Sequence, residues 1–367
     1  MLKGYKIIDA DSHVIEPPQM WEKYIDPKFK DFIPSLDMKI KGEPITTKIS
    51  QKVREEGNKQ MMKAHPHAYM NRYSPEVNVQ AIVQMGIDIT FIYPTYGLWI
   101  FAIDSLPSEV IGAFTHAYNT WLYEEYCSYD PQRLKGVGAI NFHDPQDMIQ
   151  ELYRIANWGW KAVILRPNPV KGRILSDLTY EPFWKACEEL DIAVGIHEGT
   201  HSHLPTIGTD RFTSRFALHA CSHPMEHMMA LLALIEGGVL ERHPQLRVGF
   251  LESGCGWLPY WLWRLDEEYK NLYWEVKNNV KLLPSEYFKR QCYIAIEPSE
   301  IYLSQIVEYI GYDNLIFGSD YPHMDHQADV VNNVVALEGK LSQKIVKKIL
   351  WDNPRRFYNL KVLENDY

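Results

Sequence analysis

Residues 315–323 read LIFGSDYPH, a short apolar run that ends in acidic and imidazole side chains. Residues 5–13, YKIIDADSH, have the same character near the start of the chain. Short apolar runs rich in Val and Ile, alternating with longer helical patterns, are typical of parallel strands in βα units. The two stretches therefore predict an α/β fold whose polar groups gather at the ends of strands.

Six further apolar runs lie between these two stretches, and helical patterns separate them. One helix is predicted to begin at Ser74-Pro75-Glu76, where serine caps the helix and proline fits its first turn. We predict strands at 5–9, 89–94, 135–141, 162–166, 193–197, 246–252, 292–297 and 315–320. Eight strands over this length favour a closed (β/α)8 TIM barrel over an open doubly wound sheet. No glycine-rich phosphate motif follows the first run, which argues against a nucleotide-binding fold.

One segment interrupts this βα rhythm. Residues 26–71 are rich in Lys and Pro and show little periodicity. We interpret them as an insertion after strand one that forms a lid over the site or reaches a neighbouring subunit. Nothing else marks a domain boundary, and a single barrel commonly reaches this length, so we expect one domain over residues 1–367.

The composition excludes several classes of function. Apolar residues make up 46% of the chain, which suits a soluble protein with a large core. The formal net charge is −9 and no basic run follows a phosphate backbone, so nucleic acid is not an expected partner. No apolar stretch has the length of a signal peptide or membrane span, which predicts no membrane association and a cytoplasmic location. Five separated cysteines without a C-x-x-C pair predict neither disulfides nor a cysteine zinc site.

Metal-binding side chains stand at the ends of the predicted strands, where a barrel has its active site. In an extended backbone Asp11 and His13 point to the same side, because side chains alternate with a period of two. Imidazole and carboxylate groups from several strands can surround one point, as a divalent cation requires. The other strand ends that carry such groups are at His197-Glu198, Glu252, Glu297 and Asp320.

Four motifs give the chain a family resemblance. They are DADSHVIEP at 9–17, GIHEGT at 195–200, LIEGGVLERHPQLRVGFLESGCGWLPYWLWRLDE at 234–267 and the LIFGSDYPH of 315–323. Together they resemble the amidohydrolase-related family, in the branch of the amidohydrolase superfamily that contains aminocarboxymuconate-semialdehyde decarboxylase. The resemblance covers nearly the whole chain and implies a small-molecule substrate and a metal. It implies that Asp11, His13, His197 and Asp320 hold that metal.

The chain departs from the family pattern at the end of strand six, and it lacks a lysine at the end of strand four. Decarboxylating relatives carry a histidine at the end of strand six, where this chain has Glu252. Glu252 is interpreted either as the acid/base group, with a pKa raised toward neutrality by burial, or as a ligand to a second metal. Strand four ends in Arg166-Pro167-Asn168 and offers no lysine, so the carbamylated-lysine bridge of dinuclear superfamily members is not expected.

Further donors lie near the predicted ligands. Glu16 follows His13 by three residues and is a second candidate ligand. A helical stretch carries histidine and glutamate at spacings of three to four, partly on one face, either as ligands or as a polar helix start. Its members are His219, His223, Glu226 and His227. Many oxygen donors with a few imidazoles favour Fe or Mn over a closed zinc site.

The leading hypothesis is hydrolysis or non-oxidative decarboxylation of a small carboxylated, cyclic substrate. The metal, Zn in this hypothesis, polarises a substrate oxygen and lowers the pKa of a bound water. Asp320 is expected to bind the metal and accept a proton, and Glu252 or His223 to protonate the leaving group or carbanion. Arg166 is expected to hold the substrate carboxylate as a fork.

Two other hypotheses stay open at this point. A dinuclear Fe/Fe or Mn/Fe monooxygenase would use Glu16 and Glu252 to build the second metal position, and metal identity and number would distinguish it. A non-catalytic barrel acting as a partner subunit predicts a missing ligand, and none is missing. The insertion and the Trp-rich segment 256–274 also predict a homodimer.

Overall fold

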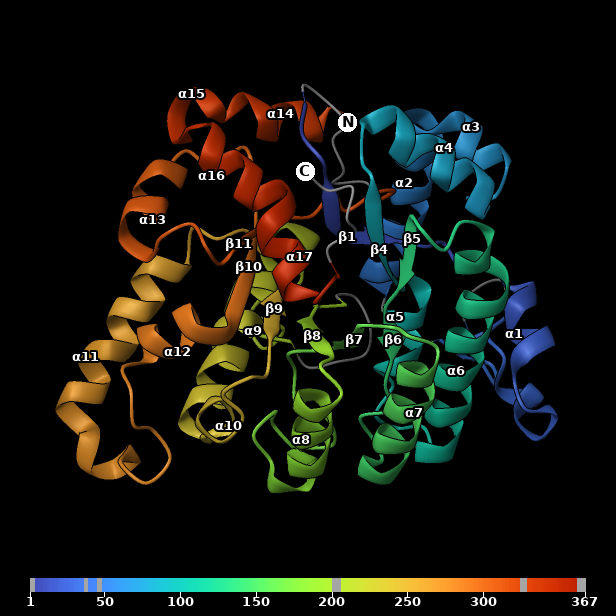
Figure 1. The fold of residues 1–367 in the computed structure, drawn as a ribbon. Helices are drawn as coiled ribbons and strands as arrows, with labels where there is room; N and C mark the ends of the chain where they lie inside the picture. Colours follow the sequence, from blue (N-terminus) through green and yellow to red (C-terminus); the bar gives the residue numbers. More distant parts are fainter. Residues whose placement is uncertain (1–3, 36–38, 45–47, 200–205, 324–328, 362–367) are drawn as a thin grey trace.

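The computed structural model describes residues 4–35, 39–44, 48–199, 206–323 and 329–361. Its centre is a ring of parallel strands surrounded by helices (Figure 1). Hydrogen-bonded neighbours follow one another in chain order and every pair among them is parallel. The strands are β1 (Ile8–His13), β4 (Ile89–Tyr93), β5 (Leu134–Gly136) with its continuation β6 (Gly138–Ala139), β7 (Ala162–Leu165), β8 (Ala193–Ile196), β9 (Val248–Phe250), β10 (Cys292–Ile296) and β11 (Leu315–Phe317).

The ring is completed where the last strand meets the first. Regular pairing leaves a three-stranded sheet, β1-β4-β5, and a six-stranded sheet, β11 through β6. The segment after β11 donates to β1 from Ser319 N and Asp320 N, both to Asp11 O, and His13 N donates to Tyr321 O. Gly318 permits this approach, because a Cβ there would lie 2.6 Å from the Cβ of Asp11. The predicted α/β fold of the (β/α)8 type is confirmed, and each of the eight predicted runs overlaps a strand.

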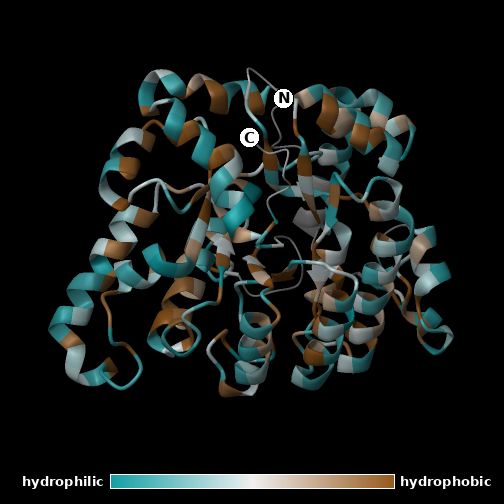
Figure 2. Ribbon diagram, viewed as in Figure 1, coloured by the Kyte–Doolittle hydropathy of each residue, from teal (hydrophilic) through white to brown (hydrophobic). Residues whose placement is uncertain are grey.

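The helices lie outside the strands and turn their apolar faces inward, with mostly hydrophilic residues outward (Figure 2). The predicted helix start at Ser74 is confirmed, since α4 begins at Pro75. The helices of the barrel are α1 (Gln19–Tyr24), α4 (Pro75–Met85), α5 (Tyr96–Phe101), α6 (Ser108–Trp121), α7 (Pro145–Asn157), α8 (Glu181–Glu189), α9 (Arg215–Glu236), α10 (Val239–Arg242), α11 (Leu258–Val276), α12 (Pro284–Gln291), α13 (Leu303–Ile310), α14 (Val330–Ala336), α15 (Glu338–Leu341), α16 (Gln343–Lys347) and α17 (Asn353–Phe357). No helix among the described residues is long and apolar enough to cross a bilayer.

The segment 26–71, predicted as an insertion after the first strand, contains regular elements although its sequence shows little periodicity. Outside residues 36–38 and 45–47, which are not described, it forms the 3-10 helix η1 (Pro27–Phe32), the hairpin β2 (Lys39–Ile40) and β3 (Glu43–Pro44), and the helices α2 (Lys48–Ala64) and α3 (Pro66–Met70). Periodicity fails here because few apolar residues anchor the segment: Met61 and Ala68 form a small core with Tyr73 and Val77. The His65 ring lies 5.0 Å from the Tyr321 ring, which brings the insertion to the loop after β11.

Candidate metal centre

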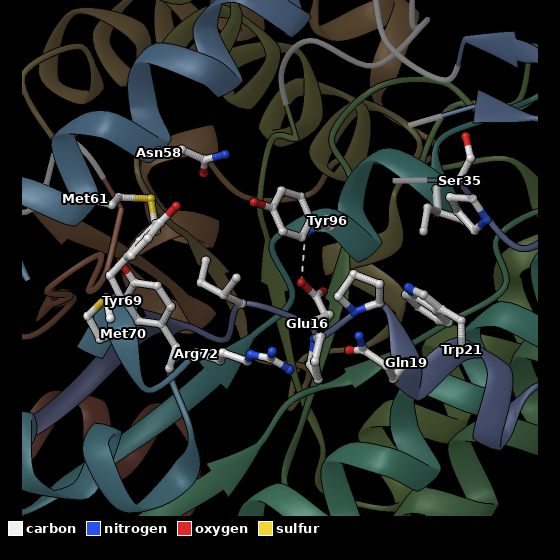
Figure 3. Close-up of a pocket in the computed structure, with 16 residues that line it drawn as sticks. Glu16, Gln19, Trp21, Ser35, Asn58, Met61, Tyr69, Met70, Arg72 and Tyr96 are labelled. Atoms are coloured by element: carbon white, nitrogen blue, oxygen red, sulfur yellow. Dashed lines mark hydrogen bonds between the residues drawn. The ribbon is translucent and has the colours of Figure 1, made fainter. Parts of the chain in front are cut away.

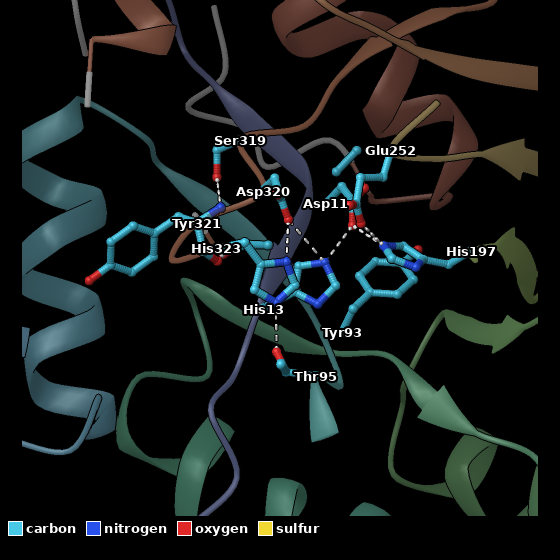
Figure 4. Close-up of polar contacts among 12 residues, drawn as sticks. Asp11, His13, Tyr93, Thr95, His197, Glu252, Ser319, Asp320, Tyr321 and His323 are labelled. Atoms are coloured by element: carbon cyan, nitrogen blue, oxygen red, sulfur yellow. Dashed lines mark hydrogen bonds and ion pairs between the residues drawn. The ribbon is translucent and has the colours of Figure 1, made fainter. Parts of the chain in front are cut away.

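The predicted ligands meet at the carboxyl ends of three strands (Figure 4). His13 Nε2 lies 3.5 Å from Asp11 Oδ1 and 3.5 Å from Asp320 Oδ1. His197 Nε2 lies 3.7 Å from the same oxygen of Asp11. β1 supplies the first pair, and the turns after β8 and β11 supply His197 and Asp320. Asp11, His13 and His197 therefore form one group by distance, and Asp320 joins this cluster through His13.

Backbone carbonyls orient both histidine rings. His13 Nδ1 lies 2.9 Å from Pro94 O, and His197 Nδ1 lies 2.9 Å from Glu198 O. A ring whose Nδ1–H donates to a carbonyl presents the lone pair of Nε2, which is the form that binds a metal. Both Nε2 atoms face the cluster. The two carbonyls thus orient both rings with Nε2 toward the cluster.

The cluster fits a divalent cation on the chemistry of its own atoms. Asp11 Oδ1 and His13 Nε2 are buried and have no hydrogen-bond partner, although such groups are costly to bury unpaired. Burial raises the pKa of the Asp11 carboxyl well above its usual range. Burial, with the neighbouring His323 and His197 rings, lowers the pKa of His13 well below its usual value. A cation at this point would satisfy the unpaired atoms and stabilise the carboxylate.

Two of the carboxylates are held in a strained backbone conformation. Glu252 has φ +52° and Asp320 has φ +53°, in the left-handed region that residues other than glycine seldom adopt. Each stands just beyond the end of its strand, β9 or β11. Strain of this kind costs about 1–3 kcal/mol and concentrates at functional sites. Here it turns both side chains toward the cluster.

His323 is a member of the site that the sequence did not assign to it. Its ring stacks on His13 at a centroid distance of 4.0 Å. Its Nδ1 lies 2.6 Å from Asp320 Oδ1, and its Nε2 lies 2.9 Å from Thr95 Oγ1. The sequence signal that could have identified it is its position three residues after the predicted ligand Asp320. Asp320 thus touches both a metal-facing histidine and a second imidazole.

Glu252 occupies the place expected for an acid/base group but is not a neutral acid. Its Oε2 lies 2.9 Å from His197 Nε2, and its Oε1 lies 3.4 Å from His223 Nε2. Burial alone would raise the pKa of Glu252, but hydrogen bonds with His197 and His223 hold it well below the usual range. The expectation of a pKa near neutrality was wrong because these imidazoles outweigh burial. Glu252 acts as a carboxylate.

Glu16 lies outside the cluster. Its buried carboxylate accepts hydrogen bonds from Thr95 N, Tyr96 N and Gly97 N, at 2.9 to 3.0 Å, and so closes the start of α5. It lines a cavity of about 510 Å³ that lies between residues 15–21 and the insertion (Figure 3). The prediction that Glu16 binds metal therefore needs correction. Spacing along the sequence did not show that the chain turns away after His13.

Arg166 is already engaged by the chain. Its guanidinium donates to both oxygens of Asp104, at 2.8 and 3.0 Å, and to the carbonyls of Ala102 and Pro169. Both terminal nitrogens of Arg166 donate to the chain and only Nε has no hydrogen-bond partner among the described residues, so the predicted role as a forked clamp for a substrate carboxylate needs correction. The arginine instead fastens the loop after α5 to the end of β7.

A cavity of about 420 Å³ opens onto the metal cluster. Its lining contains no lysine or arginine among the described residues, although it holds several carboxylates. Glu300 is tied to backbone groups, accepting from Cys255 N and Gly256 N. The functional groups of the lining are His219, His223, Glu252, Glu297, Glu300 and Asp320. An anion entering this cavity therefore meets no lysine or arginine side chain among the described residues.

Comparison with known proteins agrees with this geometry. The amidohydrolase family profile matches residues 94–360, nearly three quarters of the chain. The chain belongs to the amidohydrolase family. The match begins after β1, so the strand-one ligands Asp11 and His13 lie outside it and rest on the geometry above. The predicted family is thereby confirmed.

Named relatives of this amidohydrolase include two decarboxylases. The 2-amino-3-carboxymuconate-6-semialdehyde decarboxylase of Dictyostelium discoideum is 26% identical over 258 residues, which cover 69% of this chain and 67% of the relative. The gamma-resorcylate decarboxylase of Rhodococcus jostii is 23% identical over 231 residues, which cover 56% of this chain and 66% of the relative. The chain thus matches about two thirds of the length of each.

Solved structures establish the fold independently. An amidohydrolase from Mycobacterium avium subsp. paratuberculosis superposes with a TM-score of 0.79 at 22% identity, covering 97% of this chain and 99% of that one. The 5-carboxyvanillate decarboxylase of Novosphingobium aromaticivorans, complexed with manganese and 4-hydroxy-3-methoxy-5-nitrobenzoic acid, superposes with a TM-score of 0.73 at 19% identity. That superposition covers 98% of this chain and 97% of the decarboxylase.

Proposed function

We propose that this amidohydrolase is a divalent-metal-dependent carboxy-lyase that removes carbon dioxide from a small cyclic carboxylate. The observation that carries the proposal is the convergence of Asp11, His13, His197 and Asp320 at the mouth of the barrel. The decarboxylase names of the relatives support the reaction class, and the benzoate-type compounds in those names support an aromatic substrate. The manganese bound in two solved relatives makes Mn the first metal to test beside Zn.

The metal would be held by these four residues and would supply positive charge to a substrate carboxylate or ring oxygen. The positive charge of the metal is needed because the cavity has no lysine or arginine among its described residues. The net reaction replaces the carbon–carboxylate bond with a carbon–hydrogen bond, so one proton must reach the ring carbon as carbon dioxide leaves. We assign its delivery to Asp320, which lines the cavity and lies 2.6 Å from His323 Nδ1. His323 is placed to return a proton to Asp320 after each turnover.

Glu252 and His223 are not assigned this proton. Glu252 is held ionised by its histidine partners, and the Nε2 of His223 faces Glu252. The comparisons give no support to the dinuclear monooxygenase hypothesis. Hydrolysis by an activated water would use the same ligands, but no named relative is a hydrolase of a stated substrate. Decarboxylation therefore remains the proposal of choice.

The test is a direct assay for carbon dioxide. Metal-free protein is reloaded with Mn²⁺ or Zn²⁺ and offered a panel of hydroxybenzoates and carboxylated heterocycles, each also as its methyl ester. We expect carbon dioxide release from at least one acid, and one deuterium in the product at the vacated carbon in D₂O. Ester cleavage without carbon dioxide release, or oxygen consumption that depends on the substrate, would contradict the proposal.

Three features of organisation complete the proposal. The chain is a single domain, supported by one apolar core that extends from Tyr5 to Tyr358. It forms a homodimer, supported by exposed aromatic residues on α11, where Trp263 and Trp274 are 49% and 68% exposed. It works in the cytoplasm, supported by five free cysteines. Light scattering of wild type and Trp263→Glu tests the dimer, and cell fractionation tests the location.

A further inference from the structure

A second group of metal-binding side chains lies beside the first. His219 and His223 stand four residues apart on α9, and their ring centroids are 4.5 Å apart. Residues at this spacing share one face of a helix, as in helical histidine pairs that bind metal. Ligand atoms of His219, His223 and Glu252 all lie within 4.8 Å of one another. Two imidazoles and one carboxylate form a set that binds divalent transition metals.

His223 is oriented as a metal-binding histidine. Its Nδ1 lies 3.3 Å from Ser222 Oγ and 3.9 Å from Glu198 Oε2, while its Nε2 lies 3.4 Å from Glu252 Oε1. Glu198 is buried, and neither of its oxygens has a hydrogen-bond partner in the structure. A carboxylate behind the far nitrogen of a histidine is the usual outer partner of a metal ligand. Glu198 thus has a role for which the first metal position gives no reason.

Glu252 connects the two groups. One of its oxygens faces His197 of the first cluster, and the other faces His223 of the second. It also belongs by distance to a group with His13, Asp320 and His323. A carboxylate with one oxygen on each side is suited to bridge two cations. Its strained φ of +52° holds it between them.

Charge favours a second cation when an anionic substrate binds. Asp11, Asp320 and Glu252 carry three formal negative charges when ionised, and one divalent cation leaves this group at −1. A second divalent cation brings these three carboxylates to +1. Because Glu297 and Glu300 add negative charge to a lining that has no described lysine or arginine, an anionic substrate needs this positive charge. His219 and His223 line that cavity, so the second position is open to the substrate.

We propose that His219, His223 and Glu252 hold a second divalent transition-metal ion, with Glu252 bridging it to the metal held by Asp11, His13, His197 and Asp320. This goes beyond the proposed function, which requires one metal. The second ion would bind the substrate carboxylate. Because His219 is less buried than His13, the second ion exchanges faster than the first.

The experiment counts metal ions on the whole chain. Metal-free protein is dialysed against Mn²⁺ and metal per chain is measured by mass spectrometry, with electron paramagnetic resonance on the same samples. We expect close to two Mn²⁺ in wild type, with a spin-coupled spectrum. His219→Ala and His223→Ala should each retain close to one, with the six-line spectrum of an isolated ion. His67→Ala removes an exposed histidine from α3 and should retain two.

Circular dichroism of each variant shows whether it is folded, and Glu198→Gln gives a milder change in which His219 and His223 both remain. Saturation of wild type at one ion, or two ions in both His219→Ala and His223→Ala, would overturn the proposal. The proposed function fails separately: two ions without carbon dioxide release would contradict decarboxylation but support the second site. One ion with carbon dioxide release would support decarboxylation but contradict the second site.

Discussion

Two pairs of residues each place two metal-binding side chains on one side of the backbone. Asp11 and His13 do so on a strand, and His219 and His223 do so on a helix. On β1 the two ligands lie two positions apart, and on α9 they lie four positions apart, because side chains return to one face with different periods in strands and helices. β1 is fixed by hydrogen bonds to β4 and to the segment after β11, and both of its ligands are buried. The helical pair instead lines the cavity. A barrel can therefore hold one position rigidly within its frame and place another where substrate enters.

The largest effect on activity is expected from a substitution in the cluster at the strand ends. Asp320→Asn keeps the size of the side chain but removes a ligand charge and the proposed proton carrier. We expect kcat/KM for decarboxylation to fall by at least about 10³-fold, close to 4 kcal/mol of transition-state stabilisation. Metal content at the first position should fall as well. Full metal content with full turnover in Asp320→Asn or His197→Ala would mean that this cluster is not the site.

The next effect concerns the residue shared by both regions. Glu252→Gln retains an oxygen donor but loses the charge that faces His197 and His223. We expect both metal affinities to weaken about 10- to 100-fold, whereas His223→Ala should weaken only one. Isothermal titration with Mn²⁺ measures both steps. Loss of affinity confined to one step would show that Glu252 does not bridge.

A smaller effect is expected behind the helical pair. Glu198→Gln removes the carboxylate charge behind His223 but keeps the backbone carbonyl that holds His197. The second Mn²⁺ should bind about 10-fold more weakly and the first should be unchanged. The same titration distinguishes the steps. Equal weakening of both would contradict the division between the two regions.

The smallest effect lies outside both regions and concerns stability. The pKa of Asp104 is held well below its usual range, because the partners His143 and Arg166 outweigh its burial. A depressed folded-state pKa contributes stability above the unfolded value, about 3.9, and that stability is lost as pH falls. Asp104→Asn should cost about 1 kcal/mol at pH 7, since the group is partly exposed, and the difference should shrink below about pH 4.

Urea unfolding at pH 7 and pH 3.5 measures that difference. Because Arg166 serves Asp104 rather than substrate, KM should change less than twofold in Asp104→Asn. A large rise in KM with unchanged stability would restore Arg166 as the substrate clamp. Such a result would move the boundary of the site to the end of β7.

Much of this molecule was readable in the sequence because its signals are local. Short apolar runs predicted all eight strands, and the alternation of side chains on β1 predicted that Asp11 and His13 lie together. The helix 48–64 was not predicted because its sequence is rich in charged and polar residues, and Met61 connects it to a small apolar core. Glu16, Arg166 and the ionisation of Glu252 were misjudged because each depends on partners from distant segments.

The sequence by itself determined the barrel and the family, since apolar strand runs and family motifs are properties of short segments, and the family resemblance predicted the four-residue ligand set. Only the tertiary structure decided which polar side chains were already satisfied. It set Glu16 on the backbone of α5 and Arg166 on Asp104, and it placed His323 against Asp320. It also brought α9 over the end of β9, so that His223 meets Glu252. Hydrogen bonds and charge pairing act over a few ångströms in space, and the fold alone decides which residues come that close.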